Sequence, residues 1–335
     1  MCIRDRLKHD AWVDAVAFSP DGQTALTGSY DKTARLWDTR TGAPLSEPLK
    51  HEGVVSAVAF SPDGQTVLTG ASDKTARLWN APTGTLLVKP LKHEGEVLAV
   101  AFSPDGQTVL TRSGDKTARL WDTRTGAPLS EPLVHEDRVA AMAFSPDGQT
   151  VATASDDNTL RLWEARSGAS LGEPLKHKAD VVSVTFSPDG LNLLTGSGEL
   201  VELSGKNTGE ARLWDAHTGV PRGRPLKHEG MVGATTFSPN GQMVLTGSWD
   251  QTARLWHVSP PAISDRHNPQ RLRLSVEVRT GKRLDENGVV QRLTFDEWNT
   301  RRLELNKLGG SCDRPTWGVY LSLIHISEPT RPQCI

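Results

Sequence analysis

The chain has 335 residues, with 38 Lys and Arg against 40 Asp and Glu and a formal net charge of -2 at pH 7. Because the charge is mixed and nearly balanced, no basic field would attract nucleic acid, and we expect no nucleic-acid partner. No run of about eighteen apolar residues occurs, so the sequence predicts no membrane-spanning helix. The length alone would allow two or three ordinary domains.

Both ends of the chain read as foreign sequence. Residues 1–6 match the translation of ATGTGTATAAGAGACAG, a transposon mosaic end used in sequencing libraries, and residues 321–331 match its reverse complement continuing into the adapter. The alternative is two ordinary frayed termini, but opposite-strand copies at opposite ends predict adapter artefacts at 1–6 and 321–335. Without Cys2 and Cys334 only Cys312 is left. A single Cys forms no intrachain disulfide or zinc site, so we expect a reducing, cytoplasmic location.

Residues 7–258 hold one sequence unit six times. Each unit opens at a His and closes at a Trp, with a period of 42 residues that is broken once by a step of 51. The opening residues are His9, His51, His93, His135, His177 and His228, and the closing residues are Trp37, Trp79, Trp121, Trp163, Trp214 and Trp256. A fixed period in this range indicates one supersecondary unit repeated along the chain.

Each unit carries four short strand signals separated by turn signals. In the second unit the strands are expected at 54–60, 66–70, 75–80 and from 86 onward, with turns at Ser61-Pro62-Asp63-Gly64, 72–74 and 82–84. Four antiparallel strands in about 42 residues are typical of one propeller blade. The fold class predicted for this region is therefore all-β, with each first-strand Phe filling the gap between neighbouring blades.

The units resemble the repeats of the WD40 propeller family. The Trp-Asp pair stands at Trp37-Asp38, Trp121-Asp122 and Trp214-Asp215, and it is relaxed in the other three units. The resemblance implies a WD40 β-propeller with six recognisable repeats, and it leaves open a parent protein with seven or more. It also implies a buried tetrad of His, Thr, Asp and Trp in each of five units. These are His9, Thr27, Asp31, Trp37; His51, Thr69, Asp73, Trp79; His93, Thr111, Asp115, Trp121; His135, Thr153, Asp157, Trp163; and His228, Thr246, Asp250, Trp256.

The fifth unit departs from this pattern. It keeps His177, Thr195 and Trp214 but has no Asp in register, because extra residues fall within Gly198 to Glu210. We therefore expect an incomplete tetrad there. The insertion should lie between the second and third strands on the face that carries the His loops. A neutral loop extension and a partner contact are both open interpretations.

His, Thr and Asp in one unit could also suggest a nucleophilic triad. A catalytic set would occur once, whereas this set recurs five times beside a Trp, so we interpret it as structural. The Arg two positions before each Trp is expected to pair with neighbouring acids rather than form a basic ring. We therefore predict a protein that is not an enzyme and that has no cofactor and no metal site.

Aligning the units on their His shows where the copies differ. The variable positions lie three and five residues after the His and just before the turn Asp, while the Ser-Pro-Asp-Gly turns stay nearly uniform. Drift at solvated sites is one explanation, and selection for an interface is the other. The candidate partner-binding residues are Trp12, Asp14, Tyr30, Glu96, Leu98, Arg138, Asp156, Asp180, Met231 and Trp249. Aromatic and charged residues together favour a protein or peptide partner.

Residues 259–320 form a different, mainly helical tail. Asn268-Pro269 could cap a helix ending before Gly281, although the alternation of that segment also suits a strand; a turn is expected at 284–289. Thr294 and Glu297 form a capping box for a helix near 295–308. The tail resembles the segment after WD repeats in large bacterial proteins, some with an N-terminal serine/threonine kinase domain. We therefore predict an interaction scaffold, or alternatively the C-terminal regulatory or substrate-recruiting module of a bacterial signalling enzyme.

Overall fold

A computed structural model describes residues 7–199, 208–258, 282–284 and 290–292, together with Glu297, Thr300, Arg301 and Glu304. The chain divides into two compact units, residues 1–258 and 259–335. The adapter-like segments 1–6 and 321–335 and the expected helix after Asn268 lie outside the described residues.

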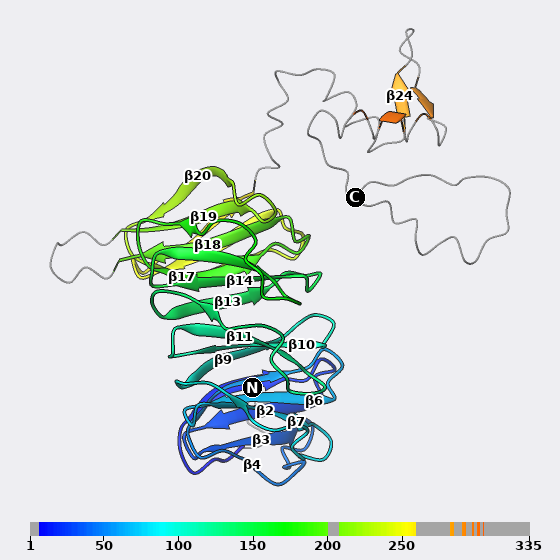
Figure 1. Ribbon diagram of the computed structural model, residues 1–335, viewed down its shortest axis with the longest axis vertical. Coiled ribbons are helices and arrows are strands. Elements are labelled where there is room, and N and C mark those ends of the chain that lie inside the picture. The colour runs from blue at the N-terminus through cyan, green and yellow to red at the C-terminus, as the bar shows by residue number, and fades with distance from the viewer. Residues whose placement is uncertain are drawn as a thin grey trace. The chain divides into compact units, whose positions relative to one another are not determined.

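The first unit consists of six antiparallel sheets in chain order, which we number as blades 1 to 6 (Figure 1). Blades 1 to 3 contain β1 (Val13–Phe18), β2 (Thr24–Ser29), β3 (Thr33–Asp38), β4 (Leu49–Lys50), β5 (Val55–Phe60), β6 (Thr66–Ala71), β7 (Thr75–Asn80), β8 (Leu91–Lys92), β9 (Val97–Phe102), β10 (Thr108–Ser113), β11 (Thr117–Asp122) and β12 (Leu133–Val134). Blades 4 to 6 contain β13 (Val139–Phe144), β14 (Thr150–Ser155), β15 (Thr159–Glu164), β16 (Leu175–Lys176), β17 (Val181–Phe186), β18 (Asn192–Gly198), β19 (Gly209–Asp215), β20 (Pro221–His228), β21 (Val232–Phe237), β22 (Met243–Ser248) and β23 (Ala253–His257). The predicted all-β repeat fold of a WD40 propeller is confirmed.

Turn chemistry fixes the strand register inside each blade. Gly64 has a φ of 71°, which the Ser61-Pro62-Asp63-Gly64 turn needs, and the Ser61 hydroxyl donates to the Asp63 carboxylate at 2.6 Å. The next turn places Lys74 at a φ of 64°, in the left-handed region. On either side of this second turn, Leu68 pairs with Leu78 and Thr69 with Arg77 across β6 and β7. The alternation of β6 and β7 therefore sends the leucines to one face of the sheet.

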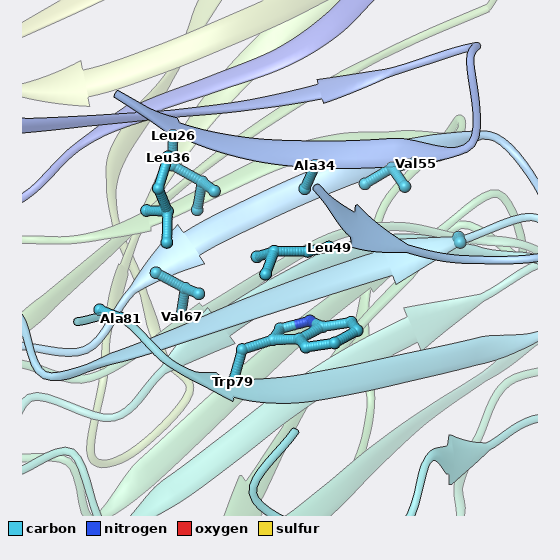
Figure 2. Packing of buried hydrophobic residues seen from close by; sticks show 9 residues of the cluster. Leu26, Ala34, Leu36, Leu49, Val55, Val67, Trp79 and Ala81 are labelled. Carbon is cyan, nitrogen blue, oxygen red and sulfur yellow. The ribbon is translucent and has the colours of Figure 1, made fainter. Parts of the chain in front are cut away.

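The core lies between blades rather than within one. Leu26, Leu36 and Leu49 of blade 1 pack against Val55, Val67 and Trp79 of blade 2, as Figure 2 shows. Phe60 packs against the same cluster, so this first-strand Phe fills the gap between blades as expected. The other junctions repeat this contact between a Leu-rich face and a Val, Phe and Trp face. Burying each such side chain contributes about 1.5–3 kcal/mol.

One junction differs from the rest. The first strands of neighbouring blades lie in close contact at every junction except the one between β9 and β13. Arg112 stands at this junction where blades 1 and 2 have Gly28 and Gly70, and a Cβ at Gly70 would lie 2.8 Å from a methyl of Val97. The Arg112 side chain therefore occupies space that the other junctions keep closed, and its guanidinium donates to the Val139 carbonyl at 3.0 Å.

Blades 1 and 6 lie at opposite ends of the stack, blue and yellow in Figure 1. The described part of blade 6 has three strands, in the order β21-β22-β23, where blades 1 to 5 have four. Phe18 of blade 1 is 70% exposed and Leu255 of blade 6 is 64% exposed, whereas the equivalent Phe237 and Leu36 are buried. Each end of the stack therefore presents a sheet face that no other described blade covers.

The insertion and part of the tail fall within the described residues. β18 and β19 extend to a Gly198–Gly209 pair, so the extra residues lie between the second and third strands of blade 5, as predicted. In the second unit β24 (Lys282–Leu284) pairs with β25 (Val290–Arg292), and these strands bracket the expected turn. Glu297, Thr300, Arg301 and Glu304 are helical, within the range predicted for the helix near 295–308.

Candidate functional site

Five complete tetrads tie the loop at the start of each repeat to the strands of its blade. In the second repeat the Trp79 indole N–H donates to Thr69 Oγ1 at 2.9 Å, and Thr69 Oγ1 lies 2.7 Å from His51 Nε2. His51 Nδ1 lies 2.9 Å from Asp73 Oδ2. Because an indole N–H can only donate, the consistent pattern runs from Trp to Thr to His Nε2, with His Nδ1–H donating to Asp.

The other four sets repeat this geometry. His Nδ1 to Asp Oδ2 distances are 2.8, 3.2, 2.9 and 2.9 Å in repeats one, three, four and six. The His side chains in these four repeats and in repeat two are at most 1% exposed. Each Asp also accepts from the backbone N–H after its His and from the Thr two positions later, as Asp73 does from Glu52 and Thr75. In the structure the tetrads are therefore buried, hydrogen-bonded networks.

The electrostatics of the tetrads favour a neutral imidazole beside an ionised carboxylate. Burial lowers the pKa of His51, His93 and His135 by more than the neighbouring Asp raises it. Burial alone would raise the pKa of Asp31, but hydrogen bonds from Thr33, His9 and the Asp10 backbone outweigh it and lower the pKa to about 2. The network therefore holds its protons in one pattern at neutral pH.

The fifth tetrad is incomplete, as the sequence predicted. His177 Nε2 lies 2.8 Å from Thr195 Oγ1, which accepts from the Trp214 indole at 3.0 Å, but His177 Nδ1 donates to the Leu175 carbonyl at 3.1 Å. With no carboxylate partner, burial lowers the pKa of His177 to about 4, and the Arg212 charge adds to this effect. A backbone carbonyl has replaced the Asp.

The Arg before each Trp lies at the same level of the blade. Arg77 donates to the Lys50 carbonyl at 2.7 Å and lies 3.3 Å from Asp73, and Arg254 repeats both contacts with Lys227 and Asp250. These two residues pair with acids and carbonyls of their own structural frame, as the sequence led us to expect, and do not form part of a free basic ring.

The variable positions of each repeat meet in pairs. In the five repeats with a turn Asp, the residue just before that Asp donates its backbone N–H to the carbonyl of the residue three after the His, at 2.9 to 3.0 Å. In the fifth repeat Gly198 makes the same bond to Asp180 at 3.1 Å. The pairs are Trp12 with Tyr30, Val54 with Ser72, Glu96 with Gly114, Arg138 with Asp156, Asp180 with Gly198, and Met231 with Trp249. Two of the three variable columns of the sequence therefore meet as one pair in each blade beside its tetrad, and we call these six pairs, taken from blade 1 to blade 6, the row.

Aromatic side chains stand at the two ends of this row. Trp12 is 80% exposed and packs edge-on against Tyr30, with ring centroids 5.7 Å apart. Trp249 is 63% exposed. Met231 is only 6% exposed because it lies under Gly198 and Gly209 of the extended β18–β19 hairpin. Met231 is therefore excluded by its burial as a surface contact, while its pair partner Trp249 is accessible.

Charged side chains stand in the middle of the row. The Arg138 guanidinium donates to Asp156 Oδ2 at 2.8 Å, while Asp156 Oδ1 is buried without a hydrogen-bond partner. Burial, followed by the charges of Asp156, Glu199 and Asp137, raises the pKa of Asp180. This part of the row has more acid than base, so it favours a basic side chain.

Of the other predicted site residues, Asp14 and Glu96 are exposed and Leu98 is partly buried. Sequence reasoning did not select Arg112, whose pKa is influenced by the nearby charges of Arg138 and Asp156. Burial and then Arg138 lower its pKa. The sequence does single out Arg112 in one way. In the other five repeats the equivalent position holds a small residue, namely Gly28, Gly70, Ala154, Gly196 and Gly247.

Two other kinds of site are absent from the part of the chain that the structure describes. Among these residues no group of three or more His, Cys, Asp or Glu side chains is arranged to hold a metal ion. Among those same residues no helix is long and apolar enough to cross a membrane.

Six sheets in sequence, each locked by a His, Thr and Trp network, define a blade-repeat protein. The family described as WD40 (WD domain, G-beta repeat) matches residues 2–38, 42–80, 84–122, 126–164, 170–215 and 222–257, which is most of the chain. The chain therefore belongs to the WD40 family.

Similar proteins share short stretches of this repeat. The chain is 39% identical over 62 residues to the periodic tryptophan protein 2 homolog of Neurospora crassa, covering 18% of this chain and 7% of that protein. It is 50% identical over 40 residues to the small ribosomal subunit protein RACK1 of Caenorhabditis elegans, 12% of each chain. It is 50% identical over 38 residues to apoptotic protease-activating factor 1 of Homo sapiens, 11% of this chain and 3% of that protein. The chain thus spans only a small part of these relatives.

Proposed function

We propose that this protein is a non-catalytic scaffold that binds an extended peptide or a protein loop along the row of variable pairs. The observation that carries the proposal is the row itself. Five complete tetrads and the partial network of the fifth repeat stand beside six equivalent backbone pairs, while the side chains on those pairs differ from blade to blade. A rigid frame with varied side chains is suited to recognition of a linear partner.

The composition of the row supports a protein partner. Exposed tryptophan is enriched in the energetic centres of protein interfaces, and truncation of such residues typically costs about 2 kcal/mol or more. Trp12 and Trp249 provide apolar anchors, and the acidic surroundings of Asp156 and Asp180 would accept a Lys or Arg of the partner. The RACK1 relative is named as a ribosomal subunit protein, which agrees with a role in an assembly.

The repeated chemistry argues against a hydrolytic use of the His and Asp groups. The His51 and Asp73 side chains are 0% and 8% exposed. The Thr69 hydroxyl, which bonds His51 Nε2, also accepts a hydrogen bond from the Trp79 indole. A nucleophile must reach substrate, and Thr69 is fully buried. The tetrads therefore serve as the frame of the proposed binding face.

The test begins with capture of a partner by the purified chain and continues with titration of variants against it. Trp12→Ala and Trp249→Ala should each weaken binding about thirtyfold, corresponding to about 2 kcal/mol. Arg138→Ala should alter the affinity and its salt dependence. Val134→Ala, an exposed apolar side chain on β12, serves as the matched control. Full affinity in all three row variants, with normal melting, would move the binding site elsewhere.

The alternative is that the chain is a regulatory or substrate-recruiting module of a larger bacterial signalling enzyme such as a serine/threonine kinase. The motivating observation is the second unit with its β24–β25 pair after the blades. Recovery of the complete reading frame tests this idea directly, because a kinase domain upstream of residue 7 would support it. A complete reading frame without such a domain would contradict this alternative and would leave the scaffold as the one proposed function.

A further inference from the structure

A cavity opens at the junction between blades 1 and 2, beside their Ser-Pro-Asp-Gly turns. It has a volume of about 320 Å³ and draws its lining from both repeats. The lining includes Pro20, Asp21, Leu45, Asp63, Gly64 and Pro82. Because β1 and β5 run from the His loop to this turn, the cavity lies at the end of the blades opposite the row. It is therefore a separate site from the one proposed for peptide binding.

Two contacts between the blades bound this cavity. Gly64 of blade 2 faces Pro20 of blade 1, and a Cβ at Gly64 would lie 3.4 Å from Pro20 Cδ. Gly84 of blade 2 faces Ser46 of blade 1, and a Cβ at Gly84 would lie 2.9 Å from Ser46 Oγ. Two turns of blade 2 therefore press against blade 1, and Pro82 lies in the second of them.

The same frame recurs at the junction between blades 3 and 4. Gly148 faces Pro104 there, and Gly168 faces the outer segment of blade 3. The turn that ends at Gly168 contains Arg166 where the blade 2 turn contains Pro82. The aligned residues of blades 1 to 5 are Arg40, Pro82, Arg124, Arg166 and His217. Blade 2 is therefore the exception among these five blades, because the Pro82 side chain has no charge and no hydrogen-bond donor.

Arg166 acts on a carboxylate across its junction. The hydrogen bond from the Ser103 hydroxyl is the largest cause that lowers the pKa of Asp105, and the charge of Arg166 lowers this pKa further. Asp21 is the equivalent carboxylate at the junction between blades 1 and 2. Its pKa is lowered by the Ser19 hydroxyl and by backbone N–H groups of its own turn. The junction between blades 1 and 2 therefore has the carboxylate without the guanidinium.

Each of the two carboxylates in the cavity has one oxygen available. Asp21 Oδ1 accepts from the Ser19 hydroxyl at 2.6 Å and from the Gln23 N–H at 3.0 Å. Asp63 Oδ1 is held in the same way within its own turn, at 2.6 and 3.0 Å. Among the described residues, none hydrogen-bonds to Oδ2 of either side chain. The turns therefore fix the carboxylates and leave one oxygen of each for another donor.

We propose that this cavity binds an arginine side chain of a partner protein, in the position that Arg166 fills between blades 3 and 4. The guanidinium would donate to the free Oδ2 of Asp21, with Asp63 contributed by blade 2, and its methylene stem would lie on apolar side chains. These side chains are Pro20, Leu45 and Pro82.

Arginine suits the cavity better than lysine, because its planar guanidinium presents two parallel N–H groups to one carboxylate. Asp21 and Asp63 are exposed, so salt screens the ion pairs, and the affinity should fall as the salt concentration rises.

The test titrates the full 335-residue chain with acetyl-arginine methylamide and follows the backbone amide signals by NMR. This compound should shift the signals of Gly64, Gln65 and Ala81, which line the cavity. Acetyl-citrulline methylamide has the same shape without the charge and should not shift them. Equal shifts with both compounds, or no shift with the arginine compound at any concentration, would overturn the proposal.

Asp21→Asn isolates the charge of the cavity, because the turn accepts Asn. In blade 6, Asn240 Oδ1 accepts from the Ser238 hydroxyl at 2.7 Å and from the Gln242 N–H at 3.1 Å. The variant should therefore fold normally and bind the arginine compound about fivefold more weakly, the upper range for one exposed ion pair. Asp105→Asn is the matched control at the other junction and should bind as the wild type does.

Exchanging residues between the two junctions gives the sharpest result. Pro82→Arg should fill the cavity from within the chain and abolish binding of the arginine compound. Arg166→Pro should open an equivalent cavity and add a second set of shifts at Gly148 and Gln149. Binding that survives Pro82→Arg would contradict the proposed position of the guanidinium.

Two further measurements identify the occupant. Trp12→Ala should bind the arginine compound as the wild type does, so a failure of the row and a failure of the cavity are distinguishable. Light scattering should give the same molar mass for the wild type and Asp21→Asn. A smaller molar mass for the variant would assign the cavity to an arginine of a second copy of this chain and would overturn the proposal of a partner protein.

Discussion

Replacing Asp73 with Ala removes the carboxylate that closes the tetrad of the second repeat. Asp73 accepts from His51 Nδ1 at 2.9 Å, from the Glu52 N–H at 3.0 Å and from the Thr75 hydroxyl at 2.7 Å. The variant would leave the His51 N–H buried without an acceptor, since this side chain is 0% exposed. The other two donors lie nearer the surface and can turn to water.

The size of the effect follows from these contacts. A hydrogen bond to a charged group contributes about 1.5–3 kcal/mol, and a buried donor left without a partner costs about 1–3 kcal/mol. These two figures describe one loss, so we expect a decrease of about 2–3 kcal/mol in the free energy of unfolding. For a domain of this size that corresponds to a fall of roughly 5–10 °C in melting temperature.

Chemical and thermal denaturation of the wild type, Asp73→Ala and Glu52→Ala check this prediction. Glu52 is the matched control because its exposed side chain lies beside the same loop and only its backbone enters the network. Any loss of partner binding in Asp73→Ala should follow unfolding. Unchanged melting together with lost binding or lost activity would refute the structural role and revive a chemical one.

Two further predictions concern charge inside the blades. Burial lowers the pKa of His177 from 6.5 to about 4. The unfolded chain therefore takes up this proton first, and stability is lost as pH falls below 6.5 until about pH 4. The loss between neutral pH and about pH 5 should be about 2 kcal/mol, and His177→Gln should reduce it in denaturation at both pH values. Arg112→Ala should raise the melting temperature, because Ala154 fills this position without a desolvated charge; a fall would show that the Val139 contact stabilises the junction.

The repeat made the blades and tetrads predictable. The pattern that runs from Thr69-Gly70 through a turn to Trp79 is local in sequence, so the same residues form the same strands and turns in every repeat. The incomplete fifth tetrad was predictable for the same reason, since the letter Asp is absent in register. The pairing of Trp12 with Tyr30 across the sheet could not be read from a comparison of each variable column by itself, because the pairing joins two columns that are far apart along the chain.

The remaining differences arise from contacts between units. Met231 occupies a variable, surface-type position, yet the extended hairpin of the preceding blade covers it at Gly198 and Gly209. Within its own repeat Arg112 looks like an ordinary strand residue. Its effect is seen only at the junction with the next blade, where the first strands β9 and β13 are not in close contact. Neither effect is visible within one repeat, because each depends on what the adjacent repeat places against it.

The exposed faces of blades 1 and 6 also reflect contacts between neighbouring repeats. Within the described residues a blade buries its Leu face against the next blade and its Val and Phe face against the previous one, so blades 1 and 6 each keep one face that no other described blade covers. Phe18 and Leu255 are exposed, although the same residue types at the equivalent positions Phe237 and Leu36 are buried. Burial at these positions therefore depends on the neighbouring blade and not on the residue type.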